Sequence, residues 1–263
     1  MLNQEQAAPS GPLLSIKEGV ATLTLNRPAH RNRLEDEDLH SLLRSFAQID
    51  ADASIRVLVL TANTQGQPKP VFCAGYHIGG FDSGTHDPQL FEKIPDALAA
   101  LRPVTVCALN GSVYGGATDL VLACDLRVGL AGMEFRMPAT ALGLHYYPSG
   151  LQRYVTRLGI NGAKRAFLTA RPFTTEMLLK MGCFEEVVGA DQFGHAVSKL
   201  VNEVVALAPL AVQATKRSLD EIAGGRFDLP VLREREALTA GSQDFQEGRN
   251  AFLEKRKPRF SGC

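Results

Sequence analysis

The sequence predicts an α/β protein whose final third is helical. Between Leu13 and Gly129, short runs of apolar and β-branched residues alternate with segments in which apolar residues have helical spacing. Such alternation is typical of strand–helix units with right-handed parallel crossovers. After Pro148, helical periodicity prevails. With 263 residues, 45% of them hydrophobic, the chain is long enough to bury a sizeable core.

The expected strands are one hairpin and three further runs. Leu13–Lys17 and Val20–Leu25 flank a Glu-Gly pair, which predicts the hairpin. The run RVLVLTA at Arg56–Ala62 is short and apolar, as suits a buried parallel strand. We expect a second buried strand at Val104–Leu109 and a third strand at Asp125–Gly129.

The expected helices carry apolar residues three or four positions apart. Leu39, Leu42 and Phe46 show this spacing in the first of them. Thr174 is the expected N-cap of a later one, because its side chain can accept a hydrogen bond from the first turn. The expected helices are Leu34–Ile49, Gln89–Leu101, Gly115–Ala123, Leu151–Leu158, Ala163–Leu168, Thr175–Met181, Gln192–Ala208, Ala211–Ile222 and Val231–Ala240.

Charge and composition argue against several partners. Lys plus Arg equals Asp plus Glu at 28 each, so the whole molecule has no net attraction to nucleic acid or an anionic membrane. No apolar run approaches the roughly 20 residues that span a bilayer. The start, MLNQEQAAPSGP, lacks the regions of a signal peptide, and residues 1–12 are expected to be a disordered leader. We therefore expect a cytoplasmic protein without nucleic-acid or membrane partners.

The cysteines indicate reduced thiols. There are five, scattered and without a CxxC pair. Each is expected to be buried and inert, because free cysteine packs as a small hydrophobic residue. No cluster of residues has the spacing of a zinc site, so we expect no metal.

A first glycine-containing segment, VFCAGYHIGGF at Val71–Phe81, follows a strand and a loop. Gly75 permits a backbone conformation that other residues resist. The turn could therefore expose the next N–H groups to a ligand. An ordinary glycine turn would give the same pattern, and this segment alone does not separate the two interpretations.

A second segment, NGSVYGGATDLVLACDLRV at Asn110–Val128, follows a buried strand. Gly115 and Gly116 open an apolar helix, and a glycine pair there lets a substrate oxygen approach N–H donors that have no partner within the helix. Close helix–strand packing is the alternative explanation. The phosphate-binding patterns GxxxxGK[ST] and GxGxxG are absent.

Together the two segments resemble the crotonase (enoyl-CoA hydratase/isomerase) superfamily. Four blocks match in order, with family-like spacing from about Ile16 to Phe260. They are Leu25–Pro28 for L-N-R-P, Phe72–Ile78 for F-[CS]-A-G-x-D-[IL], Asn110–Asp125 for N-G-x-x-x-G-G-x-x-[ED]-L…C-D, and Phe252–Phe260 for F-x-E-K-R-x-P-x-F.

The resemblance implies a fold, an assembly and a ligand. The fold is a crotonase-like spiral of ββα units over residues 13–200, followed by a C-terminal helical trimerisation region over residues 201–263. The implied assembly is a homotrimer or hexamer. The implied substrate is an acyl-CoA thioester, so that coenzyme A enters with the substrate and no cofactor is bound.

The resemblance also implies a set of site residues. The family polarises the thioester carbonyl with two backbone N–H groups, which by position are those of Tyr76 and Gly116. Phe252 and Lys255 would complete the CoA site, often from a neighbouring subunit. Without the match, the basic run from Lys255 would be interpreted as a solvated tail. The CoA-binding residues implied are Ala29, His30, Arg31, Ala74, His77, Ile78, Phe252 and Lys255.

The chain departs from the hydratase pattern at its acids. A hydratase uses two glutamates to activate water and move the proton. At the first position this chain has Asp119, which keeps the carboxylate on a shorter stem. At the second it has Ala139, which cannot transfer a proton. The family's usual aspartate before Ile78 is replaced by His77.

Two nearby residues could substitute for the missing acid. Tyr146 falls where methylmalonyl-CoA decarboxylase, a crotonase relative, places an active-site tyrosine, and GSVYGGATD resembles that enzyme's GSVWGGAFE. His145 could act as a base or an acid near neutral pH, although a structural histidine would look the same. The expected catalytic residues are Asp119, Tyr146 and His145.

These observations favour an enoyl-CoA hydratase/isomerase-like lyase or isomerase that stabilises a thioester enolate. Two alternatives remain open from the sequence. One is acyl-CoA decarboxylation or C–C hydrolysis by a member of the same superfamily. The other is a non-catalytic paralogue that binds acyl-CoA without turning it over.

Overall fold

The structure is a computed structural model that describes residues 11–77, 87 and 89–263. Most of the expected leader, residues 1–10, lies outside the described residues, as does Ile78 of the implied CoA site.

The main sheet has six strands in the order β1-β2-β3-β5-β7-β10. The hairpin pair β1 and β2 is antiparallel, as expected, and every other neighbouring pair in this sheet is parallel. The expected buried strands are therefore confirmed as a parallel core. The six strands are β1 (Leu13–Lys17), β2 (Val20–Leu25), β3 (Val57–Ala62), β5 (Val104–Leu109), β7 (Leu126–Leu130) and β10 (Glu186–Val188).

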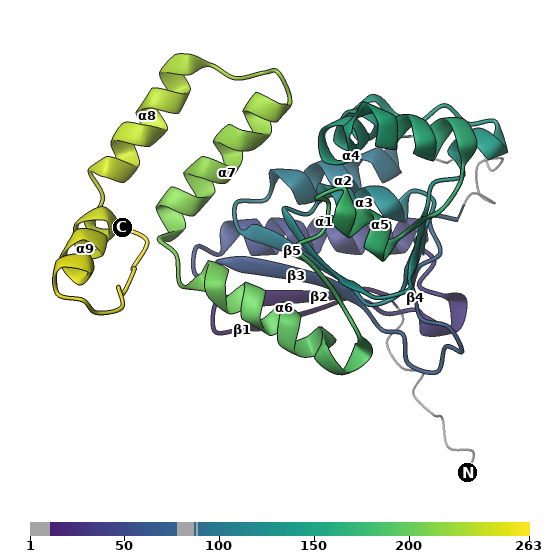
Figure 1. The fold of residues 1–263 in the computed structure, drawn as a ribbon, viewed down its shortest axis with the longest axis horizontal. Coiled ribbons are helices and arrows are strands. Elements are labelled where there is room, and N and C mark those ends of the chain that lie inside the picture. The colour runs from purple at the N-terminus through teal and green to yellow at the C-terminus, as the bar shows by residue number, and fades with distance from the viewer. Residues whose placement is uncertain (1–10, 78–86, 88) are drawn as a thin grey trace, which may run out of the picture.

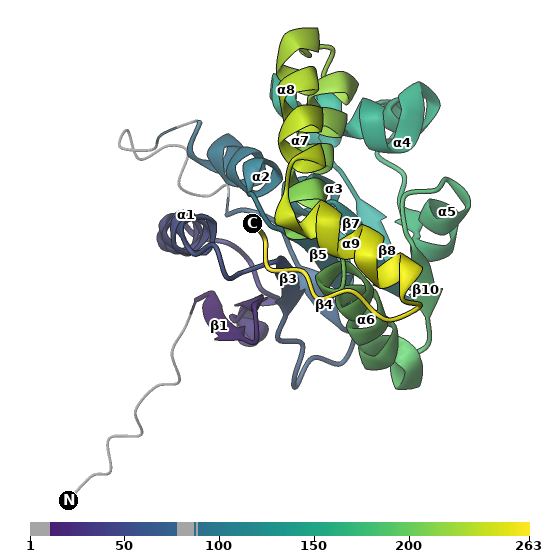
Figure 2. The ribbon, with the colours of Figure 1, turned by 90° about the vertical axis from the view of Figure 1, so that its left-hand side faces the viewer.

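Helices cover both faces of this sheet (Figures 1 and 2). Val57 and Val59 of β3 pack with α6, whereas Leu58 and Leu60 belong to the core on the other face. Because side chains alternate along a strand, a continuous apolar run is what a strand buried on both faces requires. The helices concerned are α6 (Ala190–Val205) and, in the larger core, α1 (Asp36–Ala51), α2 (Leu90–Ala100) and α3 (Ala117–Ala123).

A second sheet of four very short strands, in the order β4-β6-β8-β9, carries the two glycine turns. Strands β4 and β6 lie in the two glycine-containing segments, but none of the four was predicted as a strand. A run of two or three residues is too short for alternation to be detected. The strands are β4 (Val71–Cys73), β6 (Ser112–Tyr114), β8 (Glu134–Arg136) and β9 (Phe173–Thr174).

The helical final third follows the expectation in outline. Gly159, with φ of 67° and ψ of 166°, divides α4 (Pro148–Thr169) into two pieces near the two expected helices. Thr174 caps α5 (Thr175–Lys180) by accepting a hydrogen bond from the Met177 N–H at 3.2 Å. The remaining helices are α7 (Pro209–Ala223), α8 (Leu229–Ala240) and α9 (Gln243–Leu253), and α9 was not expected.

Three expectations about local structure need correction. Leu34 is not helical: it forms a β-bridge with Tyr76, and α1 begins after Glu35. The third helix begins at Ala117 with Gly116 as its N-cap, because Gly115 adopts a positive φ of 59°. Cys263 is exposed, unlike the other four cysteines, because it ends the chain outside the core.

The C-terminal helices α7, α8 and α9 lie to one side of the main body (Figure 1). The expected division at residue 200 falls inside α6, which packs on the main sheet with Val201 buried. The next helix, α7, still contacts the edge of the main body through Lys216, which donates to the Pro103 carbonyl. Within the described residues, no single helix is long and apolar enough to cross a membrane, and α6 with α7 reaches that length only across a bend of 104°.

Candidate active site

The two glycine turns meet at the ends of β4 and β6. These strands are parallel neighbours, with Cys73 paired to Val113. Gly75 has a φ of +102°, and a Cβ on it would lie 3.0 Å from the Tyr114 carbonyl oxygen and 3.6 Å from Gly115 Cα. Only glycine accommodates both the conformation and this approach. The structure therefore brings Tyr76 and Gly116, the two expected oxyanion donors, onto adjoining turns.

The first turn is fixed by its pairing with the residues before α1. The Leu34 N–H donates to the Gly75 carbonyl and the His77 N–H to the Leu34 carbonyl, both at 2.9 Å. The buried Cys73 thiol donates to the Asn32 carbonyl at 2.9 Å, and burial raises the pKa of this thiol to about 12. A thiol with so high a pKa stays protonated and is no nucleophile at neutral pH.

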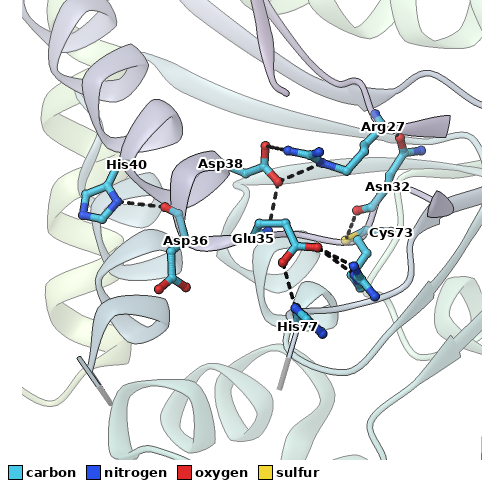
Figure 3. Close-up of polar contacts among 9 residues, drawn as sticks. Arg27, Asn32, Glu35, Asp36, Asp38, His40, Cys73 and His77 are labelled. Atoms are coloured by element: carbon cyan, nitrogen blue, oxygen red, sulfur yellow. Dashed lines mark hydrogen bonds and ion pairs between the residues drawn. The ribbon is translucent and has the colours of Figure 1, made fainter. Parts of the chain in front are cut away.

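Polar side chains reinforce this pairing (Figure 3). His77 lies 2.9 Å from one carboxylate oxygen of Glu35, and the other oxygen accepts from Arg33 at 2.6 Å. Burial alone would raise the pKa of Glu35, but Arg33 and then His77 lower it overall. The Tyr76 hydroxyl donates to Asp36 at the start of α1. The turn that carries the Tyr76 N–H is thus tied to α1 by its neighbours and its own side chain.

The expected CoA-binding residues near the N-terminus lie beside these turns. Ala29, His30 and Arg31 are exposed around a 3₁₀ turn. The Ala74 N–H donates to the Arg31 carbonyl at 2.9 Å, and the Arg31 guanidinium lies 5.8 Å from the centre of the Tyr114 ring. An exposed cationic group therefore borders the two glycine turns.

Phe252 and Lys255 are not brought to this place within one chain. Phe252 lies in α9 with 84% of its surface exposed, and Lys255 follows in an exposed left-handed conformation. Helix α9 and strand β4 are at opposite sides of the view in Figure 1. Any contact of these two residues with the glycine turns must therefore come from another copy of the chain.

Asp119, the expected first acid, is fully buried and held by three hydrogen bonds. Arg153 donates Nε to one carboxylate oxygen at 2.9 Å and Nη2 to the other at 2.7 Å. The second oxygen also accepts from the Tyr147 hydroxyl at 2.5 Å. Arg153 in turn donates Nη1 to Asp96 of α2 at 2.6 Å. The carboxylate is thus inaccessible to solvent and already paired.

The two adjacent tyrosines differ in exposure. Tyr146 is buried, with 6% of its surface exposed, and its hydroxyl donates to that of Tyr147 at 2.9 Å. Tyr147 is only half-buried. Burial and then the Asp119 charge raise the pKa of both phenols, which keeps them neutral. Tyr147 and Arg153 were missed by the sequence analysis, since nothing local shows that they reach Asp119.

Phe91 links the tyrosine pair to the glycine turns. A Cβ on Gly116 would lie 2.6 Å from its ring, so ring and backbone are in close contact. The centre of the ring lies 5.4 Å from that of Tyr76 and 6.3 Å from that of Tyr147. An aromatic wall formed by Tyr76, Phe91 and Tyr147 therefore runs from the expected oxyanion donors to the Asp119 network.

His145 and Ala139, the remaining two positions considered for acid–base chemistry, have contrasting environments. His145 is exposed in the loop before α4, and it makes no hydrogen bond or ion pair within the described part of the chain. Ala139 is buried, with 4% of its surface exposed, at the start of a 3₁₀ turn. Across residues 11–77, 87 and 89–263, no three His, Cys, Asp or Glu side chains gather as a metal site.

Known proteins of one family resemble this chain over nearly its whole length. Residues 15–263 match the family model described as enoyl-CoA hydratase/isomerase. The chain is 29% identical to 2,3-dehydroadipyl-CoA hydratase of Escherichia coli, over 95% of this chain and 98% of the relative. It is 30% identical to enoyl-CoA hydratase domain-containing protein 2, mitochondrial, of Bos taurus, over 95% of this chain and 87% of the relative.

A solved structure supports the fold. DspI of Pseudomonas aeruginosa superposes with a TM-score of 0.84 at 29% sequence identity, covering 98% of this chain and 99% of that one. The expected mixed α/β fold of the crotonase type is thereby confirmed.

Proposed function

The chain belongs to the enoyl-CoA hydratase/isomerase family, and we propose that it converts acyl-CoA thioesters through an enolate held by the Tyr76 and Gly116 N–H groups. The proposed reaction class is that of a lyase or isomerase. Two fixed donors would stabilise the enolate oxygen, a contribution of roughly 3–4 kcal/mol for each donor in comparable sites. The chemistry needs no cofactor beyond the CoA of the substrate.

The close approach of the Gly75 and Gly115 turns is the observation that carries this proposal. A Cβ on Gly115 would lie 3.7 Å from Gly75 Cα, so the residues that follow them are neighbours in space. Gly116 is the N-cap of α3, a position whose N–H has no partner within the helix. Exposed Arg31 beside the turns supports the recognition of an anionic CoA.

The experiment compares Gly116→Pro with Gly116→Ala. Any side chain here meets the Phe91 ring at about the same place, so both variants disturb packing. Only proline removes the N–H donor. We expect Gly116→Pro to lose roughly a hundredfold more turnover than Gly116→Ala, as for one lost oxyanion donor. Equal turnover in two folded variants, checked by circular dichroism, would refute the role of Gly116.

Substrates for this comparison come from a panel of CoA thioesters, with products identified by mass spectrometry. Binding is measured separately by titration calorimetry with CoA and acetyl-CoA, and should weaken with added salt. Failure of every CoA ligand to bind would overturn the proposal. Binding without turnover of any thioester would instead identify a non-catalytic paralogue.

A second candidate reaction is decarboxylation of a malonyl-type thioester. It is favoured by the pairing of Asp119 and by Ala139, because neither position offers a free acid or base. The bond between the α-carbon and the carboxylate breaks, CO₂ leaves, and the electron pair passes into the enolate. Water then protonates the α-carbon. Release of CO₂ from methylmalonyl-CoA, faster than hydration of crotonyl-CoA, would select this reaction.

A further inference from the structure

The contacts of the Asp119 carboxylate suit a structural role better than that of a general base. Its two oxygens accept three hydrogen bonds, and the side chain has no exposed surface. A base that activates water must be within hydrogen-bond reach of that water. Here three of the roughly four acceptor positions of the carboxylate face Arg153 and Tyr147, and the side chain has no exposed surface through which a water could approach the fourth. A bidentate arginine pair holds a carboxylate in its ionised form and in one orientation.

The hydrogen bonds fix the donor and acceptor roles of the Tyr147 hydroxyl. An ionised carboxylate can only accept, so the Tyr147 hydroxyl must donate to Asp119. Tyr146 must then donate to the Tyr147 oxygen. A phenol oxygen has two lone pairs, which leaves one acceptor position on Tyr147. The group that this position recognises must therefore be a donor.

Tyr147 is also rigidly placed, and part of its surface is exposed. Its ring lies 4.1 Å, centre to centre, from that of Tyr146 on one side. A Cβ on Gly150 would lie 2.7 Å from the Tyr147 ring, so the first turn of α4 closes another side. On the side of Phe91 and Gly116 the aromatic wall continues toward the expected enolate oxygen. Tyr147 remains half-buried, whereas Tyr146 and Asp119 are buried.

We propose that Tyr147 contacts the acyl group and accepts a hydrogen bond from a hydroxyl, or from a water, at its β-carbon, while Asp119 and Arg153 position it. The inference rests on the proposed function, because it assumes that the acyl group extends from the glycine turns along the aromatic wall. It assigns a preference for hydroxyl-bearing acyl groups to a residue outside the expected catalytic set.

The test measures how strongly 3-hydroxybutyryl-CoA is preferred over butyryl-CoA in binding. Both dissociation constants are measured by titration calorimetry, with mass spectrometry to show that the ligands stay intact. One neutral hydrogen bond corresponds to a preference of roughly three- to tenfold. We expect the wild type to show it and Tyr147→Phe to lose it, judged by the ratio of the two dissociation constants measured on the same variant. Tyr154→Phe, a buried phenol bonded to Thr118, is the matched control and should keep it.

The outcomes separate this inference from the proposed function. Failure of butyryl-CoA to bind would count against the function. Binding of butyryl-CoA with no hydroxyl preference, or with a preference that survives Tyr147→Phe, would overturn the inference alone. If Tyr146→Phe loses the preference and Tyr147→Phe keeps it, the contact belongs to Tyr146, and the inference about Tyr147 is overturned.

A double-mutant cycle tests the positioning role of Asp119. Turnover is measured with the CoA thioester that the wild type converts fastest. If Asp119 acts only through Tyr147, adding Asp119→Asn to the Tyr147→Phe variant should reduce this turnover by less than about threefold. If Asp119 is a general base, the same addition should cost about a hundredfold or more and remove the acidic limb of the pH–rate profile. The second result would overturn the positioning role.

Discussion

Gly75 shows how one residue sets the geometry of the site. Replacement by alanine adds a Cβ 3.0 Å from the Tyr114 oxygen, at a φ of +102°. We predict a loss of about 2–5 kcal/mol in the free energy of unfolding, from left-handed strain together with overpacking, and a loss of turnover. Gly66→Ala is the control, because its φ is +76° but nothing lies within 4 Å. Equal losses in urea denaturation of the two variants would show that the close approach has no cost.

The alanine at position 139 leads to a prediction about the hydration of crotonyl-CoA. With Asp119 paired and no acid at position 139, the wild type should hydrate crotonyl-CoA poorly. Ala139→Glu should raise the rate, up to the roughly 10²–10⁴-fold of an acid–base group if the carboxyl reaches the substrate. Ala139→Gln has the same size without the acid and should not. Robust wild-type hydration, unchanged by His145→Ala and Tyr146→Phe, would contradict this account of the missing acid.

At the residue scale, the sequence predicts the positions of the glycine turns better than the side-chain networks. The proposed backbone donors of Tyr76 and Gly116 follow glycines whose spacing is visible in the chain, and the two turns do meet. The pairing of Asp119 with Arg153 and Tyr147 depends on how α3 and α4 pack, which no local pattern encodes. Sequence reasoning therefore singled out Tyr146 and His145, and it did not detect the contact of Tyr147 with Asp119.

At the element scale, predictability depends on the length of the segment. Strands β3 and β5 were recognised within one residue at each end, because a buried parallel strand leaves a continuous apolar run. The hairpin strands β1 and β2 were recognised from the Glu-Gly pair between them. Strand β6 is only Ser112–Tyr114, and neither alternation nor composition distinguishes it from a loop. Its pairing with β4 is nevertheless what aligns the two turns.

At the scale of elements, the contact of α7 with the main body leads to a prediction about stability. The Lys216 ammonium, on a side chain that is 9% exposed, donates to the Leu101 and Pro103 carbonyls and pairs with Asp125 at 2.8 Å. Removing one partner of a buried pair costs about 3–5 kcal/mol. We predict such a loss for Lys216→Met in urea denaturation. Lys199→Met is the control, because its pair with Glu186 is exposed, and should cost at most about 1 kcal/mol. Equal losses would show that Lys216 does not fasten α7.

At the scale of the whole molecule, the C-terminal helices expose more apolar surface than is favourable for a single chain surrounded by water. Leu219, Leu238, Phe245, Phe252 and Leu253 are each at least half exposed. A groove of about 550 Å³ lies among α7, α8 and α9 and is lined by Phe245, Phe252 and Phe260, among others. Large apolar patches of this kind mark interaction surfaces. They agree with the proposal of a homotrimer or hexamer in which a second copy covers these helices.

Phe252→Asp tests this assembly and its link to the site. A charge on the 84% exposed ring position should leave the fold of one chain intact but oppose burial against a second copy. We predict a smaller assembly by light scattering and weaker CoA binding, because the implied contact of Phe252 with CoA must come from a neighbouring copy. Leu168→Asp, at a 75% exposed position on α4, is the matched control. If Phe252→Asp keeps the wild-type mass and affinity, the partner's α9 does not complete the site. If both variants dissociate equally, the apolar surface of α9 has no special part in assembly.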